Sequence, residues 1–458
     1  MIGVDTIAAV ATGMGNSGIG IIRVSGEEAF SIIKKIFKKH GGKEWSTDDT
    51  YRAHYGYIYD EDELLDEVLI LLMKGPHSYT AEDTVEIDCH GSVLMMKRIL
   101  ETVIKYGARP AQPGEFTKRA FLNGRIDLSQ AEAVMDIINA KNRYALKSSV
   151  SQLRGKVSQR IKSLREKVIY EIAYIESALD DPEHISLEGY PEILENKLED
   201  MIREVKELLD SSDTGRVMTE GVRTVILGKP NAGKSSLMNV LAGAEKAIVT
   251  DIAGTTRDTL EEQIQLEGIN LNIVDTAGIR DTDDVVEQIG VSRAKSAAKE
   301  ADLIIYVVDA SVPLDENDEH IIEMIKERKA IVLLNKSDLE TVVDRKELEE
   351  RTGQAVVVAS AKEETGIHDL EEAVKTMFYD GKIDFNDQIY ITNVRHKTAL
   401  KESYESFMMV KKSIEDGMPE DFYSIDLMNA YEMLGSIIGE AVEEDLVNEI
   451  FAKFCTGK

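Results

Sequence analysis

The chain has 458 residues, 43% of them hydrophobic, so it can bury more than one core and is long enough for roughly two to four domains. Its 84 acidic and 54 basic side chains give a net charge of −30, which argues against a protein that grips nucleic acid through its overall field but does not exclude a local basic groove. Two cysteines, no basic segment before the first mild apolar run, and no apolar run near the roughly 18 residues of a spanning helix predict a soluble, cytoplasmic protein without a membrane partner.

The N-terminal region mixes short β-rich runs with helical stretches. Apolar and β-branched residues predict strands at 19–24, 68–73 and 84–89, and the pattern at 93–106 predicts a helix. This mixed order indicates an α+β domain over residues 1–120.

Two regions, 121–214 and 383–458, are predicted to be helical. In the first, apolar side chains such as Ala131, Val134 and Ile138 recur at helical spacing, and charged residues fill the other positions. Each region lacks a full set of packing partners of its own. We therefore expect both to belong to one all-helical domain that is interrupted by an insertion.

The interrupting segment, 215–382, alternates strand and helix. Strands are expected at 224–227, 272–274, 303–308, 331–334 and 356–358. Helical segments between them predict a mostly parallel sheet covered on both faces. The predicted fold class is multidomain α/β plus α+β: a Ras-like P-loop G domain inserted into an all-helical domain and preceded by an α+β domain.

The first strand of this segment runs into Gly-Lys-Pro-Asn-Ala-Gly-Lys-Ser at 228–235, which fits the phosphate-loop pattern at every fixed position. Such a loop turns its N–H groups toward the β-phosphate at the start of a helix. Lys234 then reaches the β and γ oxygens, and Ser235 ligates Mg²⁺. A flexible Gly/Ser loop is the alternative interpretation of this motif taken alone.

Three further motifs follow the ends of later strands. In Asp-Thr-Ala-Gly at 275–278, the aspartate can hold the Mg²⁺ shell and the glycine N–H can sense the γ-phosphate. In Asn-Lys-Ser-Asp at 335–338, Asp338 can accept both N1–H and the 2-amino group of guanine, a pairing that adenine cannot offer. Ser-Ala-Lys at 360–362 completes the base pocket. Four motifs at the carboxyl ends of strands indicate a GTP site.

The predicted GTP-contacting residues are Asn231, Ala232, Gly233, Lys234, Ser235, Ser236, Thr250, Asp251, Ile252, Ala253, Gly254, Thr255, Thr256, Asp275, Thr276, Ala277, Gly278, Asn335, Lys336, Asp338, Ser360, Ala361 and Lys362.

The hydrolytic step lacks one familiar residue. Ile279 stands where Ras-type enzymes carry the glutamine that orients water, so another group must do so. Thr256, in the polar segment 250–258, is the natural second Mg²⁺ ligand. Arg280 is either an internal charge stabiliser or a solvated surface arginine. A monovalent cation beside the phosphates, held by the Asn231 oxygen and nearby carbonyls, would supply the missing positive charge.

These motifs together resemble the MnmE (TrmE) family of tRNA modification GTPases, and the resemblance covers nearly the whole chain. Near the N-terminus it rests on Asp-Thr-Ile-Ala-Ala at 5–9, Gly-Ile-Ile-Arg-Val-Ser-Gly at 20–26 and Ser-Tyr-Thr-Ala-Glu-Asp at 78–83. The most specific segment, 113–128, includes Pro-Gly-Glu-Phe-Thr and Arg-Ala-Phe-Leu-Asn-Gly. The ending Phe-Cys-Thr-Gly-Lys at 454–458 is similar to the family's Cys-Ile-Gly-Lys.

The resemblance implies a potassium-activated GTPase whose G domains dimerise. It implies a homodimer whose N-terminal domain binds 5-formyl- or methylene-tetrahydrofolate as a one-carbon donor. It also implies a flavin-containing partner, MnmG (GidA), in a heterotetramer or larger complex that modifies C5 of the wobble uridine in certain tRNAs. By position, it assigns K⁺ to Asn231, Thr250, Ile252 and Thr255, Mg²⁺ to Ser235 and Thr256, the orientation of water to Glu287, and folate to Arg23, Glu86, Arg125 and Lys458.

Taken without the resemblance, several of these residues have simpler interpretations. Arg23 could snorkel beside its strand, Glu86 could lie on a solvated face, and His90 could be purely structural. Cys455 is either a nucleophile activated by nearby Lys458 or an inert thiol that packs a terminal helix.

The chain departs from the family pattern at three places: Gly-Met-Gly at 13–15 for Pro-Pro-Gly, Arg125 for a common lysine, and Thr456 for the usual isoleucine. The competing function is a GTP-switched scaffold in ribosome or RNP assembly without modification chemistry. A dynamin-like membrane remodeller is disfavoured because no basic amphipathic helix suited to a membrane is apparent.

Overall fold

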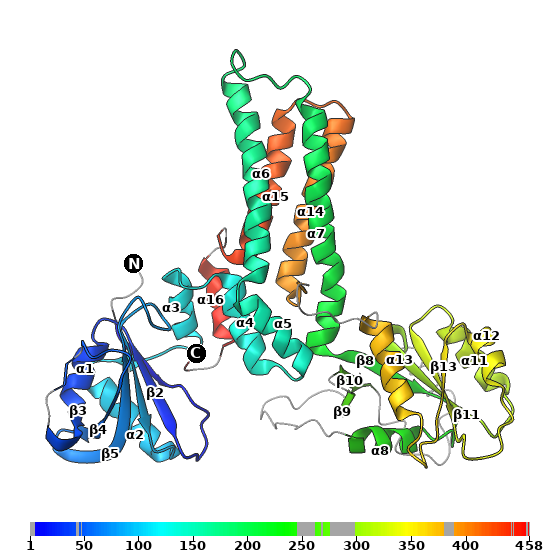
Figure 1. Cartoon of the computed structure of the whole chain (residues 1–458), viewed down its shortest axis with the longest axis horizontal. Helices are drawn as coiled ribbons and strands as arrows, with labels where there is room; N and C mark the ends of the chain where they lie inside the picture. The colour runs from blue at the N-terminus through cyan, green and yellow to red at the C-terminus, as the bar shows by residue number, and fades with distance from the viewer. Residues whose placement is uncertain are drawn as a thin grey trace. The chain divides into compact units, whose positions relative to one another are not determined.

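The structure is a computed structural model (Figure 1) that describes residues 5–42, 45–46, 48–244, 262–266, 269–274, 298–379, 389–440, 442, 444–454 and 457. Its internal contacts divide it into two compact units. The first comprises Met1–Ile138, Gln152–Pro191 and Met409–Lys458, and the second comprises Asn139–Ser151 and Glu192–Met408.

The N-terminal part of the first unit is a seven-stranded mixed sheet in the order β3-β4-β5-β6-β2-β1-β7. Its strands are β1 (Ile7–Val10), β2 (Gly20–Ser25), β3 (Phe37–Lys39), β4 (Ala53–Asp60), β5 (Glu63–Met73), β6 (Thr84–Cys89) and β7 (Arg109–Pro110). Only the β1–β7 pair is parallel. The three predicted strands and the predicted helix are present; the bounds of β2, β6 and α2 agree with the expected ones within one residue, but β5 begins five residues earlier than expected.

One face of this sheet holds the apolar core. Helices α1 (Ala29–Ile36) and α2 (Val93–Lys105) contribute residues such as Ile33 and Ile99 to a buried cluster with Ile22, Val24 and Ile87 of the sheet. Because side chains alternate along a strand, the residues between these buried ones point to the opposite face. That opposite face is where β2 and β6 carry their charged side chains.

Helices make up the rest of the first unit: α3 (Glu115–Leu122), α4 (Leu128–Asn139), α6 (Lys156–Asp180), α15 (Asp421–Ile438) and α16 (Glu444–Ala452). Helix α6 packs lengthwise on α15 (Figure 1). Arg165 crosses this seam, with its guanidinium 3.9 Å from the centre of the Tyr431 ring and an ion pair to Glu440. Gly435 lies opposite, because a Cβ there would stand 3.0 Å from the guanidinium.

The C-terminal tail returns to the N-terminal sheet. Phe451 and Phe454 of the tail join Phe121 in an apolar cluster, and a Cβ on Gly114 would stand 2.5 Å from the Phe451 carbonyl oxygen. Gly457, with φ at +98°, fits against β1 where a Cβ would meet the Val10 carbonyl oxygen at 2.3 Å. The last described residue of the chain therefore lies beside one of its first strands.

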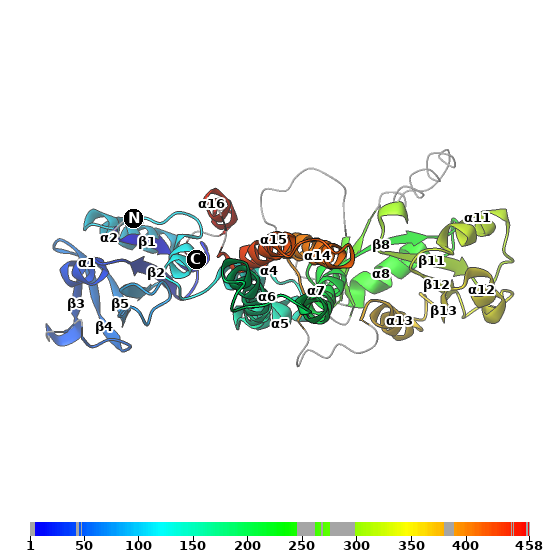
Figure 2. The same cartoon turned by 90° about the horizontal axis from the view of Figure 1, so that it is seen from above.

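The second unit contains a six-stranded sheet in the order β13-β12-β11-β8-β10-β9, of which strands β8, β11, β12 and β13 are labelled in Figure 2. Its strands are β8 (Val222–Leu227), β9 (Glu262–Leu266), β10 (Ile269–Ile273), β11 (Leu303–Asp309), β12 (Ala330–Asn335) and β13 (Ala355–Val358). The prediction of a mostly parallel sheet is confirmed, because only the β9–β10 pair is antiparallel. The edge strand β9 was not predicted.

Helices cover both faces of this sheet. Helices α8 (Lys234–Ala244) and α13 (Ile367–Tyr379) contribute to one buried apolar cluster, and α11 (Glu316–Ile325) and α12 (Arg345–Thr352) contribute to the other. The central strands β11 and β12 are buried at every residue, as a strand covered on both faces requires.

Three more α-helices, α5 (Arg143–Leu153), α7 (Tyr190–Glu220) and α14 (Val394–Glu415), and a short 3-10 helix at His40–Gly42 complete the described part of the chain. Helix α7 leads directly into β8, and its last turns are held by an ion pair between Arg216 and Asp302 at 2.6 Å. None of the helices within the described ranges is both long and apolar enough to cross a bilayer.

Candidate functional site

The phosphate loop joins β8 to α8 through three residues with positive φ: Gly228 at +151°, Asn231 at +63° and Gly233 at +98°. A Cβ on Gly228 would stand 2.4 Å from the Val307 carbonyl oxygen, and one on Gly233 would stand 2.1 Å from the Asn335 side-chain amide. The fixed glycines of the motif are therefore required by both conformation and space.

Lys234 occupies the middle of this loop. Its ammonium donates to the carbonyl oxygens of Gly228 at 2.7 Å and Lys229 at 2.8 Å. Burial lowers the pKa of the Lys234 amine. Phosphate oxygens are stronger partners for an ammonium than neutral carbonyls, so this position suits binding of the β and γ phosphates.

The outer side of the loop is fixed by a network that the motifs did not indicate. The Lys229 ammonium pairs with Asp318 at 2.7 Å and with Asp315 at 2.9 Å, and the Tyr306 hydroxyl donates to Asp318 at 2.7 Å. The Asp318 side chain is only 1% exposed. The one sequence signal for this contact was the capping pattern Asp315-x-x-Asp318 at the start of α11.

Asn335 connects the phosphate loop to the base-binding loops. Its side-chain amide donates to the Ala232 carbonyl at 2.9 Å, and its side-chain oxygen accepts from the Ala361 N–H at 3.0 Å. The residue is 1% exposed. One buried amide thus joins the three motifs that sequence analysis assigned to the phosphates and to guanine.

The carboxylate of Asp338, which is predicted to read guanine, is held in place by its neighbours. It accepts a hydrogen bond from the Ser360 hydroxyl at 2.6 Å, which lowers the pKa of Asp338, and Lys362 lies 3.8 Å away. Lys336, with φ at +62°, pairs with Asp309 at 2.6 Å. Asp309, at the end of β11, is a further residue that motif analysis missed.

Several predicted residues lie outside the described part of the chain: Thr250, Asp251, Ile252, Ala253, Gly254, Thr255, Thr256, Asp275, Thr276, Ala277, Gly278, Arg280, Glu287, Cys455, Thr456 and Lys458. Ser235 and Ser236 lie in the first turn of α8, and both are exposed. Asn231 is exposed as well. In the ranges that are described, no group of three or more His, Cys, Asp or Glu side chains is arranged to hold a metal ion.

A second constellation lies on the face of the N-terminal sheet opposite its main apolar core, where Phe116 of α3 packs with Ile7 and Ala9 of β1. Arg23 on β2 pairs with Glu86 on β6, with its Nε and Nη2 at 2.9 Å and 2.8 Å from the same carboxylate oxygen. Their side chains are 13% and 20% exposed, so neither simply faces solvent. Arg23 also donates to the Gly457 carbonyl of the tail at 3.3 Å.

An aromatic ring brings the third predicted residue into this group. The guanidinium carbons of Arg23 and Arg125 lie 5.0 Å and 4.7 Å from the centre of the Tyr79 ring, and Arg23 is 5.6 Å from that of Phe116. We call these five residues, Arg23, Tyr79, Glu86, Phe116 and Arg125, the arginine cradle. Tyr79 and Phe116 belong to motifs used for the resemblance, but their position in the cradle was not predicted.

Buried charges support the loop that carries Tyr79. Arg119 of α3, 3% exposed, pairs with Asp5 at 2.9 Å, Glu82 at 3.1 Å and Glu115 at 3.1 Å. Arg109 also pairs with Asp5 and Glu115. This charge cluster ties the loop between β5 and β6 to α3.

His90 lies elsewhere on the same domain. Its Nδ1 is 2.7 Å from Asp66, whose other oxygen accepts from the His90 backbone N–H at 2.8 Å. The Asp66 hydrogen bond raises the pKa of the imidazole. These contacts hold the ring in place, while most of its side chain stays exposed.

Comparisons with known proteins cover the same chain. A family model described as the MnmE helical domain matches residues 128–455, and one described as the N-terminus of the GTP-binding protein TrmE matches residues 6–125. The chain is similar to the tRNA modification GTPase MnmE of Lachnoclostridium phytofermentans, with 58% identity over 455 residues and 99% of each chain covered. It is also similar to that of Clostridioides difficile, with 47% identity over 455 residues and the same coverage.

Among solved structures, the G domain of the T. maritima FeoB iron transporter is 27% identical and matches 34% of this chain and 98% of that chain. The TM-score of that match is 0.27.

Proposed function

The chain belongs to the MnmE (TrmE) family of tRNA modification GTPases, and we propose that its GTP hydrolysis controls one-carbon transfer to C5 of the wobble uridine in certain tRNAs. The observation that carries the proposal is the arginine cradle, because a GTP-switched scaffold needs no such site. In this proposal the G domain is inserted into the helical domain, and all cradle residues except Arg125 belong to a separate N-terminal domain, residues 1–120.

The cradle has the chemistry of a reduced-folate site. A pterin ring presents two adjacent N–H donors, which one carboxylate such as that of Glu86 can accept together. The two arginines beside Tyr79 can stack on the pterin ring and pair with the carboxylates of the folate. The Gly457 carbonyl lies at the same place, so the tail with Lys458 would close the site over 5-formyl- or methylene-tetrahydrofolate. For Cys455 this proposal keeps both interpretations, a nucleophile and an inert thiol.

We expect this role to appear in the tRNA itself. Cells without the chain should lose C5 substitution of wobble uridine, as measured by nucleoside mass spectrometry. The wild-type gene should restore it, and Arg23→Met should not, because that change removes the charge beside Glu86 and Tyr79. Purified Arg23→Met should bind 5-formyltetrahydrofolate at least about tenfold more weakly, since charge-assisted bonds contribute roughly 1.5–3 kcal/mol each.

An unchanged nucleoside profile in cells without the chain would overturn the proposal. If the wild-type protein also showed no saturable folate binding, the scaffold function in ribosome or RNP assembly would be favoured. Arg98→Met provides the control, because Arg98 pairs with Glu63 on an exposed part of the same domain.

In the nucleotide site, Lys234 binds the β and γ phosphates and Asp338 reads guanine. Ser235 and Thr256 would hold Mg²⁺, with Asp275 in its outer shell, and Asn231, Thr250, Ile252 and Thr255 would surround K⁺. The exposed side chains of Ser235 and Asn231 fit these roles. Both cations neutralise charge that builds up on the phosphate oxygens. Glu287 would orient the attacking water, and Arg280 would add positive charge or remain in solvent.

We expect GTP hydrolysis by the full-length protein to be at least about tenfold faster in KCl than in NaCl at equal ionic strength. Asn231→Ala should remove most of that difference, because the loop then loses its side-chain oxygen ligand. Asn239→Ala, on an exposed position of α8, should leave it unchanged. Equal rates in the two salts would contradict the proposed potassium site.

The working assembly in this proposal is a cytoplasmic homodimer. It would act with the flavin-containing MnmG in a heterotetramer or larger complex on tRNA. Ordering of residues 250–258 by GTP would bring two G domains together, and the helical domain would transmit that change.

A further inference from the structure

Helix α6 begins with a concentration of positive charge that the nucleotide site and the cradle do not use. Between residues 154 and 167 there are six bases and one acid, Glu166, in a chain whose net charge is −30. The bases are Arg154, Lys156, Arg160, Lys162, Arg165 and Lys167. A local excess of this kind creates a positive potential where the protein as a whole is negative.

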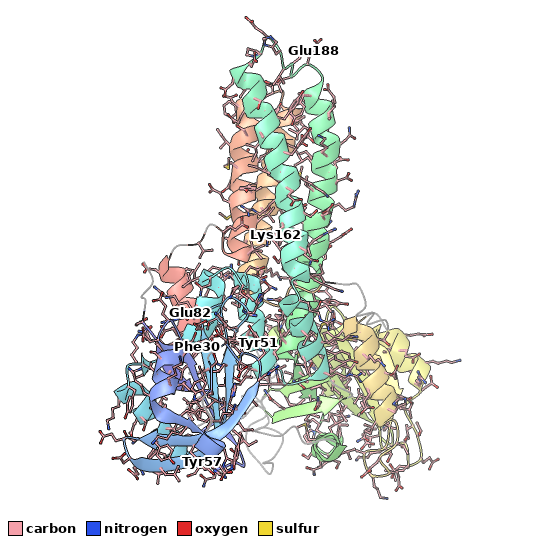
Figure 3. The ribbon with its side chains drawn as sticks, turned by 60° about the vertical axis from the view of Figure 1, so that its left-hand side comes forward. Phe30, Tyr51, Tyr57, Glu82, Lys162 and Glu188 are labelled. Carbon is pink, nitrogen blue, oxygen red and sulfur yellow. The ribbon has the colours of Figure 1, made fainter. Side chains whose placement is uncertain are left out.

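The other end of α6 has the opposite charge. Residues 168–191 contain six acids and no lysine or arginine. In Figure 3, Lys162 marks the basic part of the helix, and Glu188 lies beyond its far end. A polyanion that approaches this helix is therefore attracted to its first half and repelled from its tip.

Three of the six bases are exposed on α6 or immediately before it: Arg154, Lys162 and Lys167. Lys156 and Arg160 are half-buried. Arg165 is buried in the seam with α15, where it pairs with Glu440. Lys162 and Lys167 are five residues apart, about 140° around the helix, so they flank its exposed side, and Arg154 lies just before its first turn. We call Arg154, Lys162 and Lys167 the basic surface.

The basic surface is connected to the arginine cradle through α4. Arg125 of the cradle lies three residues before α4 begins. In the first turn of α4, the Gln130 side-chain amide donates to the Leu153 carbonyl at 2.9 Å, and the Ser129 carbonyl accepts from the Gln152 side chain at 2.8 Å. One helical turn thus joins the cradle to the residue preceding Arg154.

We propose that the basic surface binds the phosphate backbone of the tRNA, and that it places the target uridine toward the arginine cradle. This inference rests on the proposed function, which makes tRNA the substrate of the cradle chemistry. Phosphate contacts fix the position and register of a nucleic acid without reading its sequence. The acidic end of α6 favours the arrangement in which the RNA lies at the cradle end of the helix.

The test compares two full-length variants with the wild type. The first replaces Arg154, Lys162 and Lys167 by alanine. We expect its affinity for tRNA from cells that lack the protein to fall about tenfold or more at roughly 50 mM salt. The slope of log K against log salt should become shallower by about 2 to 3, because each lost phosphate contact removes roughly 0.7 to 0.9 from that slope. Fluorescence polarisation of end-labelled tRNA gives both quantities.

The matched control replaces three exposed bases of the G domain, Lys326, Arg345 and Lys346, by alanine. It changes the net charge by the same amount, so it reports the effect of the overall field. The control should bind tRNA within about twofold of the wild type. Both variants should hydrolyse GTP without tRNA at the wild-type rate, which verifies that they are folded.

The inference would be overturned if the α6 variant bound tRNA with the wild-type affinity and the wild-type salt slope. An equal loss of tRNA affinity in both variants would also overturn it. Lys162→Glu alone provides a second measurement, and it should weaken binding more than Lys162→Ala does. Failure of the proposed function gives a different result, because the wild-type protein itself would then bind no tRNA and cells without it would keep their wobble modification.

Discussion

Replacing Asp338 by asparagine is expected to lower the affinity for GDP roughly a thousandfold, or about 4 kcal/mol, and to create affinity for xanthosine diphosphate. The aspartate offers two acceptors to the N1–H and 2-amino group of guanine. Asparagine keeps one acceptor and turns the other into a donor, which faces the 2-amino group of guanine unfavourably and matches the 2-oxo group of xanthine. The Ser360 hydrogen bond lowers the pKa of Asp338, so the native carboxylate stays charged at neutral and mildly acidic pH.

Equilibrium titration with fluorescent GDP and XDP measures both effects. Asp344→Asn is the matched control: the Asp344 carboxylate caps α12 by accepting the Glu347 N–H at 3.0 Å, and asparagine caps helices equally well. It should leave both affinities as they are. Undiminished GDP binding by Asp338→Asn would mean that another group reads the base.

The largest expected effect on stability is that of Arg119→Met, which should destabilise the N-terminal domain by about 3–5 kcal/mol. The Arg119 side chain is 3% exposed and pairs with Asp5, Glu82 and Glu115. Methionine fills similar space but leaves the buried Glu115 with fewer partners and the other two carboxylates close together.

The only tryptophan of the chain makes this measurable in one domain. Trp45 packs against the core of the N-terminal sheet, with its ring centre 5.6 Å from that of Phe37, so its fluorescence in urea reports unfolding of that domain. The control Arg98→Met removes an exposed pair with Glu63 and should cost less than about 1 kcal/mol. Similar costs for the two variants would show that the buried charge cluster adds no special stability.

The same cluster has an expected pH dependence. Hydrogen bonding by Arg109 lowers the pKa of Asp5. At Glu115 burial raises the pKa, but hydrogen bonds from Arg109 and Arg119 outweigh burial and hold the pKa below its usual value. Carboxylates with lowered pKa values stabilise the folded state above their unfolded pKa, near 4, and lose that contribution as pH falls through the folded pKa. The wild type should therefore lose stability on acidification below about pH 4 more steeply than Arg119→Met does.

Local patterns predicted much of the fold and of the nucleotide site. The phosphate loop and the base-binding loops could be located because each is a short motif at the end of an apolar strand, and the glycines at 228 and 233 meet close neighbours, as the motif requires. The antiparallel edge strand β9 was missed, although its buried Ile264 and Leu266 alternate with Gln263 and Gln265, because it is only five residues long and pairs only with β10.

Contacts between distant segments could not be predicted in the same way. The pair between Lys229 and Asp318 joins residues 89 positions apart, and nothing in the phosphate-loop pattern specifies the second residue. Tyr79 and Phe116 were visible as motif residues, but their role depends on strands β2 and β6 aligning Arg23 with Glu86, a register that only the folded sheet defines.

The buried Asn335 side chain has a kinetic consequence for nucleotide release. Because its single amide bonds to both Ala232 and Ala361, a movement of the phosphate loop or of the base loop shifts a group that also bonds to the other loop. We therefore expect release of the base and release of the phosphates to be kinetically coupled. A factor that pulled on either loop would accelerate the escape of the whole nucleotide.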